Sequence, residues 1–327
     1  PAPTMHPLPM SSRLPLDARA TGAMLLLCLV WSLQQISLKA VSADISPMLM
    51  VGLRSGLAGL MVAALMRARG EGLMLHTGRW RPGLVVGALF AIEYLVVAEA
   101  LRLTHASHVV VFLYTAPMFA ALGLHWKLPS ERLHWLQWVG IAIAFGGISL
   151  AFLGRTPGAP GLGRDVLLGD LLALLGGVAW GATTVTIRCT RLASAPASET
   201  LLYQLVVACG LLLPASALLG QFRFEPTAAA WAHLGFQVLI VSFASFLLWF
   251  WLLRHYLATP LGVFSFLTPV LGVVLGIWLL DEPVELGFVL GSALVLAGIL
   301  LVSAHGWLRE RWPGLRQPLP AGLGGRD

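Results

Sequence analysis

Charged residues are scarce in this sequence: they make up 11% of its 327 residues, whereas apolar residues make up 57%. A soluble domain carries about 25% charged residues. This shortage excludes a single soluble domain and indicates a chain that lies mostly in lipid. The formal charge of +6 does not indicate a nucleic-acid partner, because the Lys and Arg residues lie in short loops and form no basic stripe.

Cysteine and the common enzyme motifs are also scarce. The three cysteines, Cys28, Cys189 and Cys209, lie inside apolar segments and form no CxxC pair, so we expect packing roles and no disulfide framework. His105 and His108 do not match a metal motif, and no GxSxG, Walker A or dinucleotide fingerprint occurs. The sequence therefore predicts no metal, no cofactor and no ATP coupling within the chain.

Long apolar runs are what the sequence has in quantity. A spanning helix needs about 20 mostly apolar residues. The first run is longer than the apolar core of a signal peptide and lacks a small-residue cleavage site, so we interpret it as a spanning helix. The sequence predicts an all-α integral membrane protein with ten transmembrane helices, at 20–41, 47–66, 82–102, 106–127, 133–153, 168–190, 198–219, 230–254, 259–280 and 285–305.

The second half of the chain repeats the first. An offset of 152 pairs Leu101, Arg102, Ala106, Phe112, Pro117 and Trp126 with Leu253, Arg254, Ala258, Phe264, Pro269 and Trp278. An offset of 149 pairs Trp31 and Lys39 with Trp180 and Arg188. Five helices per half is an odd number, so the second copy must enter the bilayer with opposite polarity. The pattern predicts two inverted five-helix repeats, an arrangement typical of secondary transporters.

The positive charges predict the orientation and the domain boundaries. With the N-terminus inside, 15 of the 21 Lys and Arg residues lie in inside segments, five lie outside and Arg54 lies within a helix. We expect a multi-pass protein of the plasma membrane (the bacterial inner membrane) with both termini cytoplasmic. The predicted parts are a disordered tail at 1–19, the first repeat at 20–153, a linker at 154–167, the second repeat at 168–305 and a tail at 306–327.

Several motifs carry a family resemblance. The first half reads W-S-L-Q-Q-I-S-L-K, L-R-S-G-L-A-G-L and Y-T-A-P-M-F-A-A-L, and residues 258–303 repeat the pattern. These segments resemble an EamA-type domain of the drug/metabolite transporter superfamily, over about residues 23–305. Pro129-Ser130-Glu131 stands where the family often has Gly-Glu. The resemblance implies a ten-helix transporter, often an exporter of amino acids or other small metabolites.

Three charged residues fall inside predicted spans, where charge is costly and marks function by default. Arg54 and Glu93 lie at similar depth, so a contact between them is possible. The alternative to a functional role for Arg54 is a structural one, as a fixed ion pair or as a snorkelling side chain. Glu93 is near the middle of its helix, where apolar surroundings favour the protonated carboxyl group, so it can exchange protons. Glu99 lies about one turn from the outer surface and can be wetted.

Aromatic residues form a second constellation. Trp31 and Trp180 lie at helix centres, away from the interface where tryptophans usually gather. We expect a central cavity that holds an apolar or aromatic group by stacking. The alternative for each side chain is helix packing or lipid contact. With Glu93, the predicted lining residues are Trp31, Phe90, Tyr94, Phe112, Trp180, Phe246, Trp249 and Phe264.

Pro117 and Pro269 occupy the same repeat position, deep in the fourth and ninth runs. Proline removes an N–H group and clashes with the preceding turn. Both are therefore predicted kinks, which act either as hinges or as static bends that shape a cavity.

The sequence thus favours a secondary transporter, and an exporter, of small organic metabolites such as amino acids, including aromatic ones, by alternating access. We expect no enzymatic activity, a small-molecule substrate, protons as a second partner, and the lipid bilayer. The oligomeric state stays open. The alternatives are an integral-membrane lipid-modifying enzyme, which needs clustered acid, base or metal residues near one interface, and a membrane scaffold or receptor, which has no need of paired prolines.

Overall fold

The computed structural model describes residue 14 and residues 17–72, 78–153, 164–283 and 285–311, and this part of the chain is helical apart from short connections and two isolated β-bridges. Within it, ten helices are long and apolar enough to cross a membrane, as the sequence predicts. Their bounds in chain order are α1 (Ala18–Ala40), α2 (Pro47–Ala68), α3 (Trp80–Leu103), α4 (Ala106–Leu113) with α5 (Ala116–Lys127), α6 (Trp135–Leu153), α7 (Arg164–Arg188), α8 (Ala197–Leu218), α9 (Ala228–Gly235) with η5 (Phe236–Ala244) and α10 (Ser245–His255), α11 (Ala258–Phe264) with α12 (Leu267–Leu280), and α13 (Leu286–Arg311).

Polar residues at the ends of the apolar runs fix where several helices begin. The Asp17 carboxylate accepts a hydrogen bond from the Ala20 N–H at 2.7 Å, and the Thr227 hydroxyl accepts one from the Ala230 N–H at 3.0 Å. Ser46 caps α2 in the same way, with Pro47 at the first helical position. Proline suits that position because its missing N–H has no partner in the helix. Short 3-10 turns, η3 (Pro129–Glu131) and η4 (Arg191–Ser194), complete two of the connections.

Two spans are broken at the predicted proline positions. The fourth span is interrupted between α4 and α5, just before Pro117, and the ninth between α11 and α12, just before Pro269. Side-chain hydroxyls satisfy carbonyls at both breaks: Thr115 donates to Phe112 O at 2.5 Å, and Ser265 donates to Gly262 O at 2.7 Å. The predicted kinks are therefore full interruptions, and their role as hinges stays a prediction.

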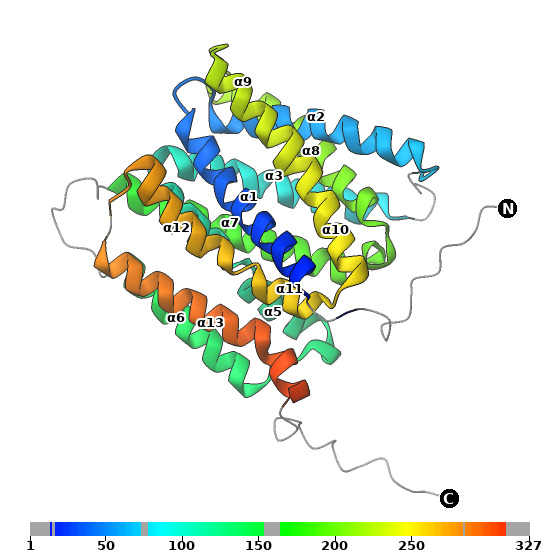
Figure 1. The fold of residues 1–327 in the computed structure, drawn as a ribbon, viewed down its shortest axis with the longest axis vertical. Helices are drawn as coiled ribbons and strands as arrows, with labels where there is room; N and C mark the ends of the chain where they lie inside the picture. The colour runs from blue at the N-terminus through cyan, green and yellow to red at the C-terminus, as the bar shows by residue number, and fades with distance from the viewer. Residues whose placement is uncertain (1–13, 15–16, 73–77, 154–163, 284, 312–327) are drawn as a thin grey trace, which may run out of the picture.

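Helices of the two halves pack in pairs rather than as separate bundles. α2 packs on α8, α6 on α13, α1 on α12, and α4 and α5 on α7; Figure 1 shows α6 and α13 side by side along one edge. Glycines bring α6 and α13 close together, since a Cβ at Gly291 would lie 2.7 Å from Gly147 O and 2.7 Å from Ala151 N. Small residues allow this close backbone approach in lipid.

The outer surface is apolar, as a lipid-facing surface requires. Trp126 is 75% exposed and Trp278, its counterpart at the offset of 152, is 74% exposed. Both tryptophans lie near the end of a spanning helix, the level at which tryptophan is enriched in membrane proteins. The equal exposure agrees with repeat-related positions, although the inverted relation of the two halves stays a prediction.

The structure corrects several predicted boundaries. α7 begins at Arg164, so the end of the predicted linker (154–167) is helical, while 154–163 lies outside the described residues. α13 continues to Arg311, so the tail expected at 306–327 begins as helix, and 312–327 also lies outside the described residues. In both cases the helix extends beyond the predicted apolar run and includes charged residues, because backbone hydrogen bonding does not require apolar side chains.

The predicted disordered tail at 1–19 is wrong for its described residues. Ala18 and Arg19 belong to α1. The Leu14 N–H donates to His255 O at 2.9 Å, and the Leu257 N–H donates to Leu14 O at 3.1 Å. These two bonds hold Leu14 against the turn between α10 and α11. Residues 1–13 and 15–16 lie outside the described part.

Candidate functional site

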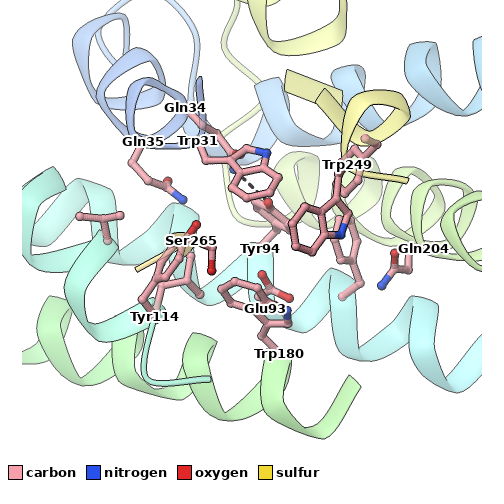
Figure 2. A pocket seen from close by; sticks show the side chains of 14 residues that line it. Trp31, Gln34, Gln35, Glu93, Tyr94, Tyr114, Trp180, Gln204, Trp249 and Ser265 are labelled. Carbon is pink, nitrogen blue, oxygen red and sulfur yellow. Dashed lines mark hydrogen bonds between the residues drawn. The ribbon is translucent and has the colours of Figure 1, made fainter. Parts of the chain in front are cut away.

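A cavity of about 250 Å³ lies between the two halves of the chain. Its walls come from α1, α3, α4, α7, α8 and α10, together with the connections after α4 and α11 (Figure 2). Both halves therefore contribute to one space. The lining residues are Trp31, Gln34, Gln35, Phe90, Glu93, Tyr94, Val110, Leu113, Tyr114, Trp180, Gln204, Phe246, Trp249 and Ser265.

Most of the predicted lining residues are brought together here. Trp31, Phe90, Glu93, Tyr94, Trp180, Phe246 and Trp249 all line this cavity. Trp31 and Trp180 do so from repeat-related positions, and so do Tyr94 and Phe246. Their role in binding a substrate stays a prediction, and the structure adds that these residues share one cavity.

Phe112 and Phe264 do not line the cavity, contrary to the prediction. Phe112 is fully buried and packs against Phe152 and Phe288, with ring centroids 5.2 Å and 6.2 Å away. Phe264 packs against the cluster that joins α1, α10 and α11. The helix α4 presents Val110 and Leu113 to the cavity, so Phe112 lies on its opposite side, towards α6 and α13.

Aromatic rings meet edge to face around the cavity. Trp31 and Trp249 have centroids 5.6 Å apart, Phe90 and Tyr94 are 4.8 Å apart, and Tyr114 and Trp180 are 5.4 Å apart. The Trp31 indole N–H also donates to the Ser245 hydroxyl at 3.1 Å. Such pairs hold the rings in fixed orientations. The walls are thus largely rigid aromatic surface.

Arg54 belongs to a polar network behind this wall. Its Nη1 donates to Gln237 Oε1 at 2.6 Å, and Gln237 Nε2 donates to Gln34 O at 2.8 Å. Gln34 Nε2 in turn donates to the Tyr94 hydroxyl at 2.9 Å. The Arg54 guanidinium also lies over the Tyr94 ring, 4.5 Å from its centroid. Arg54 therefore joins α2, η5, α1 and α3.

Glu93 does not form the contact with Arg54 that similar depth allowed. No hydrogen bond or ion pair within 4.0 Å joins the Glu93 side chain to another residue of the described part of the chain. Glu93 is only 4% exposed, yet it lines the cavity, and Figure 2 shows it among the aromatic residues there. A buried carboxyl group without a partner in the protein can hold a proton or a bound cation.

Glu99 lies near the end of α3 and is partly exposed. Its carboxylate accepts a hydrogen bond from Arg102 Nη1 at 2.7 Å, and the Glu99 side chain is 22% exposed. The Gln221 amide also donates to it. Glu99 lies outside the cavity, so its contacts are structural.

Sequence reasoning missed the polar residues of the site. Gln34, Gln35 and Gln204 line the cavity but were not selected, and Gln237, which holds Arg54, was also missed. The available signal was the neutral amide itself, because a glutamine inside an apolar run is costly unless it has a partner. Two adjacent glutamines next to Trp31 were the clearest instance.

A second polar cluster joins the halves at the ends of α1, α3 and α7. The Glu282 carboxylate accepts from the N–H groups of Ala106, at 2.5 Å, and Ser107, at 3.0 Å, where α4 begins. Lys39 Nζ donates to Thr104 O at 2.8 Å, and Asp170, which is fully buried, bonds to His108 Nδ1 at 3.0 Å. Charge-assisted hydrogen bonds therefore hold these helix ends together.

The corresponding residues at the opposite end are arranged differently. Arg188 is the counterpart of Lys39 at the offset of 149, and Glu131 lies next to Ser130, the counterpart of Glu282 at the offset of 152. The residues compared at this end are therefore Glu131 and Arg188. They form an ion pair with each other, with side chains 34% and 53% exposed. The two ends of the molecule are therefore held by different contacts.

The comparisons with known proteins agree with this architecture. The model of the EamA-like transporter family matches twice, over residues 19–153 and 167–304. The chain is 22% identical to the uncharacterized transporter YoaV of Bacillus subtilis, over 84% of this chain and 92% of that protein. It is 30% identical to the uncharacterized protein PA1977 of Pseudomonas aeruginosa, over 75% and 80% of the two chains.

Two further matches complete the comparison. The uncharacterized inner membrane transporter YedA of Escherichia coli (strain K12) is 24% identical over 88% of this chain and 91% of its own length. A protein crystal structure with 22% sequence identity has a similar fold, with a TM-score of 0.62 over 90% of this chain and 99% of its own. Since the family model covers most of the sequence in two matches, this chain belongs to the EamA-like transporter family and is a multi-pass membrane protein.

Proposed function

We propose that this membrane transporter exports small organic metabolites, such as amino acids, from the cytoplasm by alternating access. The observation that carries the proposal is the cavity of about 250 Å³ that both halves line, with aromatic walls and the unpaired carboxyl group of Glu93. A cavity between repeats is where secondary transporters bind substrate. Family membership favours transport over the integral-membrane enzyme that the sequence left as an alternative.

The difference between the two ends of the molecule supports alternating access. Glu282 holds the beginning of α4 at one end, whereas Glu131, in the corresponding turn after α5, pairs with Arg188 at the other. α3 also packs along much of α7, whereas the repeat-related pair, α1 with η5 and α10, is in lighter contact. We propose that the halves exchange these states, so that Glu282 releases α4 while Glu131 moves to the beginning of α11.

The two interrupted spans supply the bending points in this proposal. The breaks before Pro117 and Pro269 leave two short helical segments, α4 and α11, each joined to the rest of its span by a two-residue connection. Each segment begins where one of the end contacts is made or is proposed to form. Bending at these connections would move the beginnings of α4 and α11 without unwinding either span.

The setting of the transporter is also proposed. The excess of Lys and Arg in alternate loops supports cytoplasmic termini. The similarity to YedA, an inner membrane transporter, supports the bacterial inner membrane. Glu93 is the proposed point of proton coupling, because it is the acidic residue that lines the cavity.

Flux measurements in proteoliposomes test this function. Purified protein is reconstituted and efflux is followed for a panel of amino acids, amines and organic acids, with and without a pH gradient. The expected result is saturable flux of at least one compound that changes when the gradient is imposed. Chemical conversion of the compound without flux would support the enzyme alternative, and absence of both would contradict the proposal.

A further inference from the structure

The cavity has an acidic side chain in its lining but no basic one. Of its 14 lining residues, Glu93 is the acidic one, and none is Lys, Arg or His. Glu93 is 4% exposed and has no hydrogen-bond or ion-pair partner among the described residues, so no cationic side chain of this part of the chain is in contact with its carboxyl group. A cation bound beside it would supply the missing partner.

The cation nearest this region is not available to a ligand. Arg54 does not line the cavity, its Nη1 is bonded to Gln237, and its guanidinium lies over the Tyr94 ring. Tyr94 thus stands between Arg54 and the cavity. A carboxylate on a ligand would find no cationic side chain there, and it would lie in the same small space as Glu93. This arrangement disfavours zwitterionic amino acids as well as organic acids, so it narrows the proposed substrate class to metabolites without a carboxylate.

The remaining walls suit a positive charge on an apolar body. Trp31, Trp180 and Trp249 present indole rings, whose faces attract cations, and ammonium groups bind most strongly to tryptophan. Gln35 also lines the cavity, and its Oε1 is buried without a hydrogen-bond partner. An ammonium group has three donors, and the Glu93 carboxyl group and the amide oxygens of the lining glutamines are acceptors for such donors.

We propose that the cavity selects small organic cations: protonated primary amines with an apolar or aromatic body and no carboxylate. The cavity is smaller than the ~300–1,000 Å³ typical of sites for drug-sized ligands, so a body of one ring fits best. The inference rests on the proposed function only in taking this cavity as the transport site; binding itself is measured separately from flux.

Binding of four matched compounds to the purified protein tests the charge preference. The compounds are 2-phenylethylamine, 2-phenylethanol, 3-phenylpropionate and phenylalanine, which at pH 7 are a cation, a neutral molecule, an anion and a zwitterion with the same ring. Isothermal titration calorimetry in detergent should give the amine a dissociation constant at least about tenfold below each of the others, as expected for a charge-assisted hydrogen bond. Equal or tighter binding of phenylalanine or of the anion would overturn the inference.

Substitution at Glu93 assigns that preference to a residue. Glu93→Gln should weaken binding of the amine about 10- to 100-fold and leave binding of the alcohol nearly unchanged. Glu99→Gln, in the same helix but outside the cavity, is the matched control and should retain the parent preference. An unchanged preference in Glu93→Gln would overturn the inference. If that variant does not fold, the four-compound series on the parent protein still decides the question.

Flux separates this inference from the proposed function. Binding of the amine without flux of any compound would contradict transport while leaving the charge preference intact. Flux of phenylalanine that exceeds flux of the amine would overturn the charge preference while supporting transport.

Discussion

The third and eighth spans descend from the same repeat position, yet they differ in backbone and in chemistry. α3 is one continuous α-helix, whereas the eighth span contains a nine-residue π-helical segment, η5, between α9 and α10. At the offset of 152, Glu93 in α3 corresponds to Ser245, which accepts a hydrogen bond from Trp31. One copy therefore carries an unpaired acid, and the other carries a neutral hydroxyl with a partner.

The π-helical segment of the eighth span carries a residue that supports Arg54. It contains Gln237, which is fully buried and connects Arg54 to the backbone of Gln34. π-helical turns are rare and are often found at functional sites. If Glu93 binds substrate as proposed, then duplication preserved the frame of the helix, while binding chemistry is carried by one copy and structural support by the other.

Gln237→Leu breaks the supporting side of the comparison and should have the largest effect. It leaves the buried Arg54 guanidinium without its acceptor, and we expect the free energy of unfolding to fall by about 2–3 kcal/mol. Denaturant unfolding in detergent micelles measures the change. The double variant Arg54→Met/Gln237→Leu should recover part of the loss, because neither partner is then left unpaired. A single variant as stable as the parent would contradict the network.

Glu93→Ser tests the binding side by copying the residue of the eighth span into α3. We expect the initial rate of substrate efflux from proteoliposomes to fall about tenfold or more, because the acid that lines the cavity is lost. Ser245→Ala is the matched variant in the other copy and should retain most of the rate. Comparable losses in both variants would mean that the two positions have not diverged in function.

Trp31→Phe sharpens the comparison at the level of a single hydrogen bond. The indole N–H that donates to Ser245 disappears and a smaller aromatic ring remains, so stability should fall by about 1 kcal/mol for the hydrogen bond in addition to the packing that both Trp→Phe variants lose. Trp180→Phe, at the repeat-related position, keeps an edge-to-face contact with Tyr114 and should cost less. Thermal melting of the two variants side by side measures the difference. The reverse order would contradict the assigned bond.

Glu99→Gln should have the smallest effect, although Glu99 lies on the same helix as Glu93. Its ion pair with Arg102 is partly exposed, and such pairs contribute about 0–1 kcal/mol. We expect unchanged flux and a loss of stability at the low end of that range. A large loss of flux in this variant would show that the cavity is not the part of α3 that matters.

The ten spans were predictable, but the breaks within them were only partly so. Runs of about 20 apolar residues identify a span whatever its neighbours are. Pro117 and Pro269 indicated bends, and the sequence located both. The π-helical segment of the eighth span had no proline or glycine pair to mark it. Its buried Gln237 bonds to Arg54 and Gln34 in the other half of the chain, and such distant contacts cannot be read from the local sequence.

The lining residues could be predicted when their depth in the membrane was enough to identify them. The prediction failed when it also required the direction in which a side chain points from its helix. Trp31, Glu93 and Trp180 were found from their depth in the membrane. Phe112 was placed on the wrong side because five consecutive apolar residues, Val109 to Leu113, point in all directions around α4, so their periodicity gives no direction. Gln34 was missed because its role depends on the Tyr94 hydroxyl, which is 60 residues away in the sequence.

The close glycine contact between α6 and α13 has a consequence for motion. These are the fifth and tenth spans, so each is the other's counterpart in the repeat, and the same holds for α2 and α8. If the halves exchange conformations, such self-related pairs map onto themselves and can keep the same contacts throughout. These two pairs would then stay in place during transport. The helices that move would be α1, α3, α7, the eighth span and the two interrupted spans.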